Sequence, residues 1–460
     1  MLALAAPLAL AELGWMAMGV VDTVMAGPLG SAAIGAGSLG SMLFYPIAIF
    51  GTGMLLGMDA LVAQSFGAGD RPDCRRTLVN GLWLAAGLAP PLALALWTLI
   101  PLLALTGTNP RVSALFAAYL KALLWGILPL LFYTAFRRYL QAVDIVKPIA
   151  FALVSANVVN IAGNYALMYG HWGFPAMGLT GSGYSTSIAR FYMAAVLLAA
   201  VAWHERTRPL SNGAPSGPDS DSRSEPRTSE SGWCGYSFRP DIPRLRRLAA
   251  LGLPAALQIL AEGAVFGVVT VFAARLDEAS LAAHGIAVIV VSTTYMVPLG
   301  IASAAAVRVG QAVGRKDQRG VAASGWSALA IGALFMGTAG VALWTVPRWI
   351  VEVITHDAAV VAVGVGLLRI AAFFELFDGL QAVATGALRG LGDTRSPLLA
   401  HLAGYWMVGL PVAYLLCFHF RWGAPGIWVG LSAALILIGS ALLVVWKRRL
   451  SRGVGPFGPR

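Results

Sequence analysis

The chain has 460 residues, of which 58% are apolar and only 12% are charged, and its mean hydropathy is +0.74. A soluble chain carries roughly 25% charged residues, so this composition excludes water-soluble globular domains and indicates a protein solvated by lipid. The net charge of +11 does not indicate a nucleic-acid partner, because the basic residues lie in the segments between long apolar runs.

Twelve apolar runs are long enough to cross a membrane as helices, which takes about 20 residues. In chain order they are roughly 4–26, 39–64, 78–104, 114–139, 149–170, 179–203, 248–274, 281–307, 322–346, 358–388, 397–418 and 425–446. Their length and their Leu and Ala content favour helices over the short alternating strands of a membrane barrel. We therefore predict an all-α membrane protein with twelve transmembrane helices.

Lys and Arg gather in alternate loops. The loops after the even-numbered runs, together with the segment after the last run, hold 25 of the 32 basic residues, and the other loops hold 5. Cytoplasmic loops are enriched in Lys and Arg. The pattern predicts a multi-pass protein of the cell (inner) membrane with both termini in the cytoplasm.

One polar segment divides the chain. Residues 204–247 are rich in Ser, Pro, Gly and mixed charge, which is typical of a disordered linker. We predict an amino-terminal lobe at 1–203, a cytoplasmic linker at 204–247, a carboxy-terminal lobe at 248–446 and a cytoplasmic tail at 447–460.

The two halves repeat at a shift of 247 residues. The matches include Pro7 with Pro254, Gly53 with Gly300, Gln64 with Gln311, Gly67 with Gly314 and Asp70 with Asp317. Each half has an even number of runs, so both copies enter the membrane from the same side. We expect two six-helix lobes related by a pseudo-twofold axis along the membrane normal. Two unrelated bundles are the alternative.

Ionisable side chains at membrane depth are costly and usually face a cavity or a partner. The acids within the runs are Glu12, Asp22, Asp59, Glu262, Glu375 and Asp378, and the bases are Arg190 and Arg369. This excess of acids predicts an interior that attracts cations.

Glu262 lies at the centre of its run and Asp378 lies near the middle of another. A carboxyl at that depth can exchange a proton, or it can hold a dehydrated Na⁺ with neighbouring oxygens. The alternative is a structural acid paired with a base. Glu375, one turn before Asp378, either shares the site or serves helix packing.

Asp22 lies near the outer end of the first run, where it is either functional or an interface acid. Asn157, Asn160 and Asn164 are spaced three and four residues apart, which places their amides on one helical face. They either supply oxygens to an ion or substrate, or form hydrogen bonds between helices.

Glu12 and Arg190 lie about 12 Å and about 17 Å into the membrane from opposite sides, at 1.5 Å per residue. In a core of ~30 Å these depths bring them to similar levels. We predict a structural ion pair between them, with Asp22 as the competing partner of Arg190.

Several short segments resemble one transporter family. They are VDTVMAG (21–27), VAQSFGAGD (62–70), LPAALQILAEG (253–263), AAHGIAV (282–288), VRVGQAVG (307–314) and FDGLQAVATGALRGLGDTRSP (377–397). In this order they resemble the MATE (multidrug and toxic compound extrusion) family, in its NorM-type branch. The resemblance implies two lobes arranged in a V, and drug export coupled to inward Na⁺ or H⁺.

The resemblance also assigns roles to residues. It implies ion coupling by Asp22, Glu262 and Asp378, with Na⁺ at Glu262 and Asp378 if sodium is the ion, and it matches Asn160 and Asn164 to a polar pair of the amino-terminal lobe. Asn164 is neutral where a proton-coupled archaeal branch has an acid. Relatives often carry Gln at the position of Glu12.

Together these observations predict a secondary active exporter of amphipathic organic cations, with no cofactor beyond the coupling ion. A drug cation and a coupling cation would compete for the same carboxylates, including Asp22. Phe266 and Phe377 would offer flat surfaces for cation–π contacts, unless they are core residues. We expect drugs and the lipid bilayer as partners, no nucleic acid, and a monomer.

Two alternatives remain open. A flippase for lipid-linked oligosaccharides, from the same superfamily, would need a cationic cavity. A membrane enzyme or receptor would need a catalytic constellation or a folded soluble domain. The GxGxxG match at 35–40 follows no strand, and no P-loop Lys or paired metal-binding His is present. We therefore expect no enzymatic activity.

Overall fold

The computed structural model describes residues 1–104, 109–207 and 238–452. Within these ranges the chain is helical and contains no strand. Eleven helical stretches are long and apolar enough to cross a membrane, and a bent pair of helices, with an angle of 43° between them, makes up to twelve. The predicted all-α membrane fold is confirmed.

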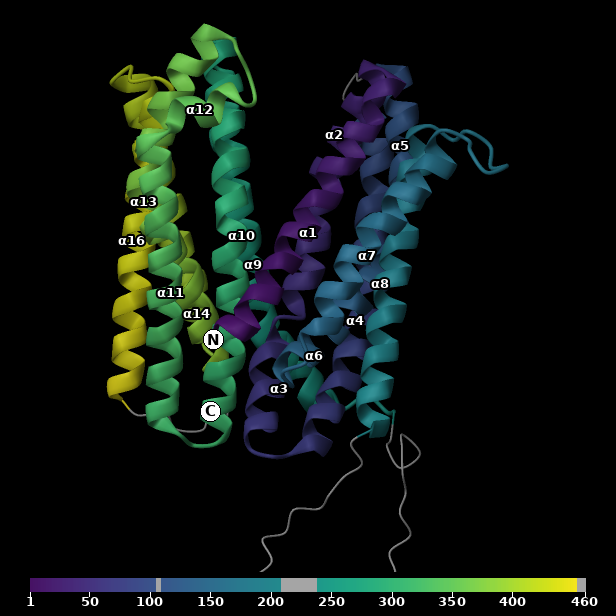
Figure 1. Ribbon diagram of the computed structural model, residues 1–460, viewed down its shortest axis with the longest axis vertical. Helices are drawn as coiled ribbons and strands as arrows, with labels where there is room; N and C mark the ends of the chain where they lie inside the picture. The colour runs from purple at the N-terminus through teal and green to yellow at the C-terminus, as the bar shows by residue number, and fades with distance from the viewer. Residues whose placement is uncertain (105–108, 208–237, 453–460) are drawn as a thin grey trace, which may run out of the picture.

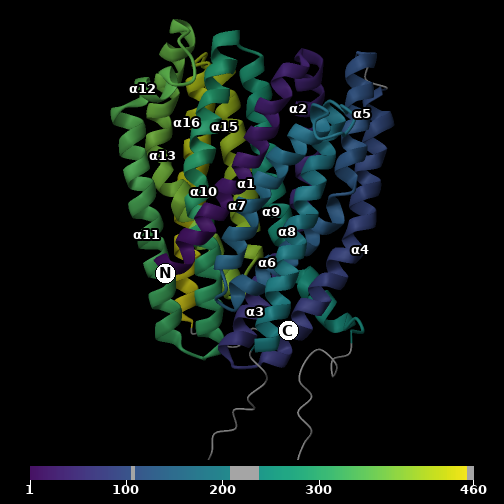
Figure 2. The same ribbon diagram turned by 45° about the vertical axis from the view of Figure 1, so that its right-hand side comes forward.

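Two groups of helices stand side by side, and their upper halves diverge (Figure 1). After a turn of 45° about the vertical axis the two groups overlap in the view (Figure 2). The first group consists of α1 (Leu2–Ala26), η1 (Gly27–Leu29), α2 (Ser31–Met54), α3 (Gly57–Gly67), α4 (Arg71–Ala104), α5 (Pro110–Leu124), α6 (Ile127–Ala142), α7 (Lys147–Gly163), η2 (Asn164–Met168) and α8 (Leu179–Thr207). The second consists of α9 (Ile242–Ala274), α10 (Glu278–Gly314), α11 (Gln318–Thr345), α12 (Pro347–Glu352), α13 (Ala358–Gly390), α14 (Arg395–His401), η4 (Leu402–Gly409), α15 (Leu410–Tyr414), η5 (Leu415–His419) and α16 (Ala424–Ser451). The first group ends at Thr207 and the second begins at Ile242, so both extend past the predicted bounds of the lobes at 203 and 248.

The predicted disordered linker, 204–247, is wrong at both ends, because residues 204–207 belong to α8 and residues 242–247 belong to α9. Residues 208–237 lie outside the described residues. The first part of the predicted tail continues α16 as far as Ser451.

Each lobe has a core of its own. Phe44, Phe116 and Tyr133 are buried in the core of the first lobe, and Trp428 and Trp446 are buried in that of the second. Most residues of each core come from one lobe, while Leu4 and Leu8 of α1 also belong to the core of the second lobe.

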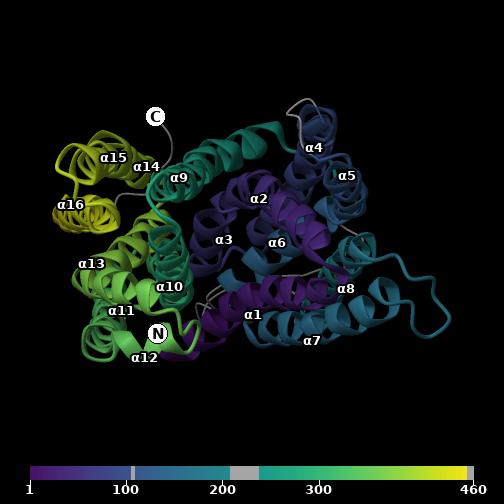
Figure 3. The ribbon, with the colours of Figure 1, turned by 90° about the horizontal axis from the view of Figure 1, so that it is seen from above.

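The lobes cross at small residues, through α1 with α10 and α2 with α9 (Figure 3). A Cβ added at Gly53 would lie 2.7 Å from the Cα of Ala256. At the equivalent position in the repeat, a Cβ added at Gly300 would lie 2.6 Å from the Cα of Ala9. Small residues at such crossings let membrane helices approach closely. The sequence repeat thus coincides with a symmetric contact between the lobes.

Candidate functional site

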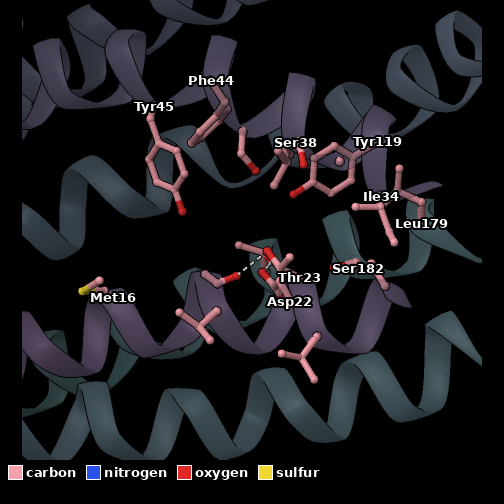
Figure 4. A pocket seen from close by; sticks show the side chains of 18 of the residues that line it. Met16, Asp22, Thr23, Ile34, Ser38, Phe44, Tyr45, Tyr119, Leu179 and Ser182 are labelled. Atoms are coloured by element: carbon pink, nitrogen blue, oxygen red, sulfur yellow. Dashed lines mark hydrogen bonds between the residues drawn. The ribbon is translucent and has the colours of Figure 1, made fainter. Parts of the chain in front are cut away.

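A cavity of about 500 Å³ opens in the first lobe. Its walls come from α1, α2, α5 and α8, and one residue of the second lobe, Ile289 on α10, completes the lining. Asp22 and Thr23 lie on one side of the cavity, facing Tyr45, Ser38 and Tyr119 (Figure 4). The cavity is large enough for a drug-sized molecule.

Asp22 is held in place by two other helices. Its Oδ1 accepts a hydrogen bond of 2.7 Å from Nδ2 of Asn164, and its Oδ2 accepts one of 3.0 Å from Oγ1 of Thr186. Asn160 contacts both donors: its Oδ1 accepts from Nδ2 of Asn164 over 3.4 Å, and its Nδ2 donates to Oγ1 of Thr186 over 3.4 Å. The predicted polar face of the 149–170 run therefore meets Asp22. Asn157 instead donates to the carbonyl oxygen of Gly14, which links α7 to α1.

A second polar cluster lies inside the second lobe. Nε2 of Gln381 on α13 lies 3.2 Å from Oδ1 of Asp378, 3.5 Å from Oε1 of Glu262 and 3.3 Å from the hydroxyl of Tyr295. The Tyr295 hydroxyl also donates to Glu262 over 3.3 Å. The two predicted carboxylates thus come from α9 and α13 and share one amide donor.

His401 joins this cluster and was missed from the sequence. Its Nε2 lies 2.8 Å from Oε1 of Gln381 and 3.7 Å from Oε2 of Glu262, and the ring is fully buried. Its Nδ1 lies 2.8 Å from the carbonyl oxygen of Pro397. A single His in an apolar run has no local pattern that would indicate this contact.

Glu375 is also fully buried and accepts from the Thr294 hydroxyl at 3.2 Å and 3.3 Å. Phe377 and Phe266 do not line the amino-terminal cavity. Phe377 lies against Gly439 of α16, and Phe266 packs on the core of the second lobe. Arg369 is exposed, with its Cζ 5.9 Å from the centroid of the Trp344 ring.

The predicted pair of Glu12 with Arg190 is wrong. Glu12 forms its ion pair with Arg137 of α6. Depth along the membrane normal put Glu12 level with Arg190, but it does not fix which helix a side chain faces. Arg190 instead stacks over Phe44, with its Cζ 4.5 Å from the ring centroid, and lines the cavity that contains Asp22.

Asp59 also has a structural role. It is buried at the seam between the lobes, 3.0 Å from Nε of Arg389 in the second lobe and 3.6 Å from Nη1 of Arg138 in the first. Of the six in-span acids, two are therefore paired with arginines. The acids left for chemistry are Asp22 in one lobe, and Glu262, Asp378 and Glu375 in the other.

No group of three or more His, Cys, Asp or Glu side chains is arranged to hold a metal ion within the part of the chain that the structure describes. The chemistry of these carboxylates allows them to hold a proton or to accept a cation.

The sequence matches the MatE family over residues 7–166 and 254–415, which covers most of both lobes. The probable multidrug resistance protein NorM of Mesorhizobium japonicum is 36% identical over 97% of this chain and 93% of its own length. The chain belongs to the MatE family. The multidrug resistance protein NorM of Burkholderia vietnamiensis is a further relative, 34% identical over 97% of this chain and 92% of its own.

Solved structures agree with the MatE assignment at the level of the fold. A eukaryotic MATE transporter has a TM-score of 0.82 at 17% identity, covering 98% of this chain and 97% of that one. A multidrug resistance MATE family transporter in an outward-facing conformation has a TM-score of 0.83 at 17% identity, covering 98% and 95%. The resemblance inferred from the short motifs is confirmed.

Proposed function

We propose that this MatE protein is a secondary active multidrug exporter, which exchanges amphipathic organic cations from the cytoplasm for Na⁺ or H⁺ from outside. The observation that carries the proposal is the sharing of Gln381 by Glu262 and Asp378. Two carboxyls joined by one neutral amide favour a bound cation or proton between them, because neither has an arginine partner among the described residues. The names of the NorM relatives support multidrug export.

The two clusters have separate tasks in this proposal. The carboxy-terminal cluster binds the coupling ion, and the cavity around Asp22 binds the drug. Ile289 of α10 lines that cavity, and α10 also carries Tyr295, which donates to Glu262. A shift of α10 on ion loading would therefore alter the cavity wall and release the drug.

Alternating access supplies the direction of transport. Ion pairs and hydrogen bonds join the lobes at the end that bears the arginine-rich loops, including Arg389 with Asp59 and Arg308 with Asp144. The ribbons diverge at the other end (Figure 1). With the basic loops in the cytoplasm, this arrangement corresponds to an outward-open state.

The test uses Glu262→Gln and Asp378→Asn, each of which removes a charge and keeps the shape. We expect each to abolish efflux of ethidium from energised cells while the protein still reaches the membrane. Glu352→Gln is the matched control, because Glu352 lies on the short helix α12 and pairs only with Arg348 one turn away. Normal efflux by both cluster variants would refute the coupling role of this site.

The flippase alternative requires a cationic cavity. The cavity of the first lobe contains one arginine and one aspartate, and the cluster of the second lobe contains three acids. These charges favour export of amines over binding of a pyrophosphate.

A further inference from the structure

Arg190 is a buried arginine whose charge is not matched by an acid in contact with it. Its side chain is 4% exposed, and its Nη1 is buried without a hydrogen-bond partner. The other buried arginines have acids: Arg137 pairs with Glu12, and both Arg138 and Arg389 pair with Asp59. A buried guanidinium without an anion is expensive, so its position needs an explanation.

The fold makes room for this arginine. A Cβ added at Gly126, at the break between α5 and α6, would lie 2.9 Å from both Cδ and Nη1 of Arg190. On another side, the guanidinium stacks on the Phe44 ring at 4.5 Å. The bend of 43° between α5 and α6 thus coincides with the place where Arg190 needs space.

Arg190 and Asp22 line the same cavity without neutralising each other by direct contact. The two oxygens of Asp22 accept from Asn164 and Thr186. Among the described residues, no carboxylate lies within ion-pair distance of Arg190, and Phe44 is its close contact on the cavity wall. The cavity therefore presents one anionic and one cationic group at separate places.

We propose that Arg190 forms an anion-accepting subsite, so that this cavity prefers amphipathic zwitterions, with their cationic group toward Asp22 and their carboxylate toward Arg190. This inference rests on the proposed export function and specifies its substrate class. Tyr45, Tyr119 and Phe44 line the space between with aromatic rings, which suits a flat ligand.

The second lobe lacks this subsite. The run 425–446, which corresponds to the run 179–203 in the repeat, contains no Lys or Arg. The cluster of Glu262 and Asp378 is therefore suited to a small cation, whereas the cavity of the first lobe is suited to a ligand with both charges. The two lobes differ in charge and need not share a ligand.

The experiment measures equilibrium binding by full-length protein in lipid nanodiscs, with no ion gradient. The probes are tetramethylrhodamine, which has a free carboxylate, and its methyl ester, which is a simple cation with the same fluorophore. We expect wild-type protein to bind the acid about tenfold more tightly than the ester, as a charge-assisted hydrogen bond would give. Arg190→Gln should abolish this difference in affinity, because it should weaken binding of the acid without weakening binding of the ester.

Two further variants separate recognition from folding. Arg190→Lys keeps the charge and should retain part of the preference for the acid. Gly126→Ala should displace the guanidinium and reduce the same ratio in a protein with its arginine intact. Asp22→Asn should weaken binding of both probes, which would show that the measured binding takes place in this cavity.

An acid-to-ester ratio that is equal in wild type and Arg190→Gln would overturn the subsite. Equal weakening of both probes by Arg190→Gln would also overturn it, since that result indicates a structural role, and so would an absence of binding by either probe. Failure of the coupling proposal alone would leave this ratio unchanged, because the binding assay contains no ion gradient.

Discussion

Arg137 shows how a single buried charge constrains the first lobe. Its side chain is 7% exposed, and that of its partner Glu12 is 17% exposed. Breaking a buried pair by removing one member leaves an uncompensated charge, which costs about 3–5 kcal/mol. This pair ties α1, which carries Asp22, to α6.

Glu12→Gln should therefore lower the free energy of unfolding by about 3–5 kcal/mol. The double variant Glu12→Gln/Arg137→Gln should recover much of that loss, because no charge is left unpaired. Thermal melting of purified protein measures both effects. Glu12→Gln/Arg190→Gln is the control, and its effect should equal the sum of the two single effects, because these residues are not in contact. A departure from additivity in that control, and additivity in the Arg137 double variant, would contradict the pairing.

His401 offers a second test at this scale. His401→Phe should remove the polar contact of Oε1 of Gln381 beside Glu262 and leave that buried oxygen unpaired, at a cost of about 1–3 kcal/mol. We expect ion-driven efflux to fall while ligand binding at Asp22 is retained. His401→Asn can still form a hydrogen bond and should keep more activity. Equal transport by the Phe and Asn variants would show that the hydrogen bond of His401 has no role in coupling.

Between whole elements, the contact of the lobes is nearly symmetric. Gln64 on α3 donates over 3.0 Å to the carbonyl oxygen of Gly390 at the end of α13. Gln311 on α10 donates over 3.0 Å to the carbonyl oxygen of Ala142 at the end of α6. The two glutamines match at the repeat shift of 247, so one contact is formed twice across the seam.

Removal of these contacts should favour opening of the seam. Each hydrogen bond contributes about 0.5–1.5 kcal/mol, so Gln64→Ala/Gln311→Ala should shift the equilibrium between the closed and the open seam by about 5- to 150-fold. Spin labels at Arg76 and Arg319, in a variant without native cysteines, would report the distance between the lobes. We expect a new population at longer distance. An unchanged distance distribution would show that the glutamines do not hold the seam.

The element scale also shows what a sequence predicts well. The shift of 247 residues identified Gln64 with Gln311 and Gly67 with Gly314, and these residues meet across the seam. A Cβ added at Gly67 would lie 2.0 Å from the carbonyl oxygen of Gln311, and one added at Gly314 would lie 2.0 Å from that of Gln64. The span pattern was predictable because hydropathy and helix length are local properties.

Partners across the lobe were harder to predict. Asp22, Asn160 and Asn164 were expected to be polar sites, because local spacing reveals a helical face. The contacts of Glu12 and His401 depend on how helices are rotated relative to each other, which one sequence does not specify. The pairing of Glu12 with Arg137 therefore needed the structure.

At the scale of the whole molecule, the proposed export function requires movement of one lobe against the other. The connection between the lobes must then tolerate that movement. The predicted spacer 211–235 lies outside the described residues, and its composition offers little apolar surface to bury. Deletion of 211–235 should leave efflux close to that of wild type in intact cells. Loss of transport in a deletion variant that reaches the membrane would show that this segment has a further task.

Counterflow in proteoliposomes tests the central claim most directly, with Na⁺ and pH gradients imposed separately. The account predicts that one of these gradients alone drives uptake of an organic cation against its own gradient. It also predicts that Glu262→Gln and Asp378→Asn lose this response but still bind the drug. Uptake that is independent of both gradients would contradict the account. Gradient-driven uptake that is retained in both variants would also contradict it.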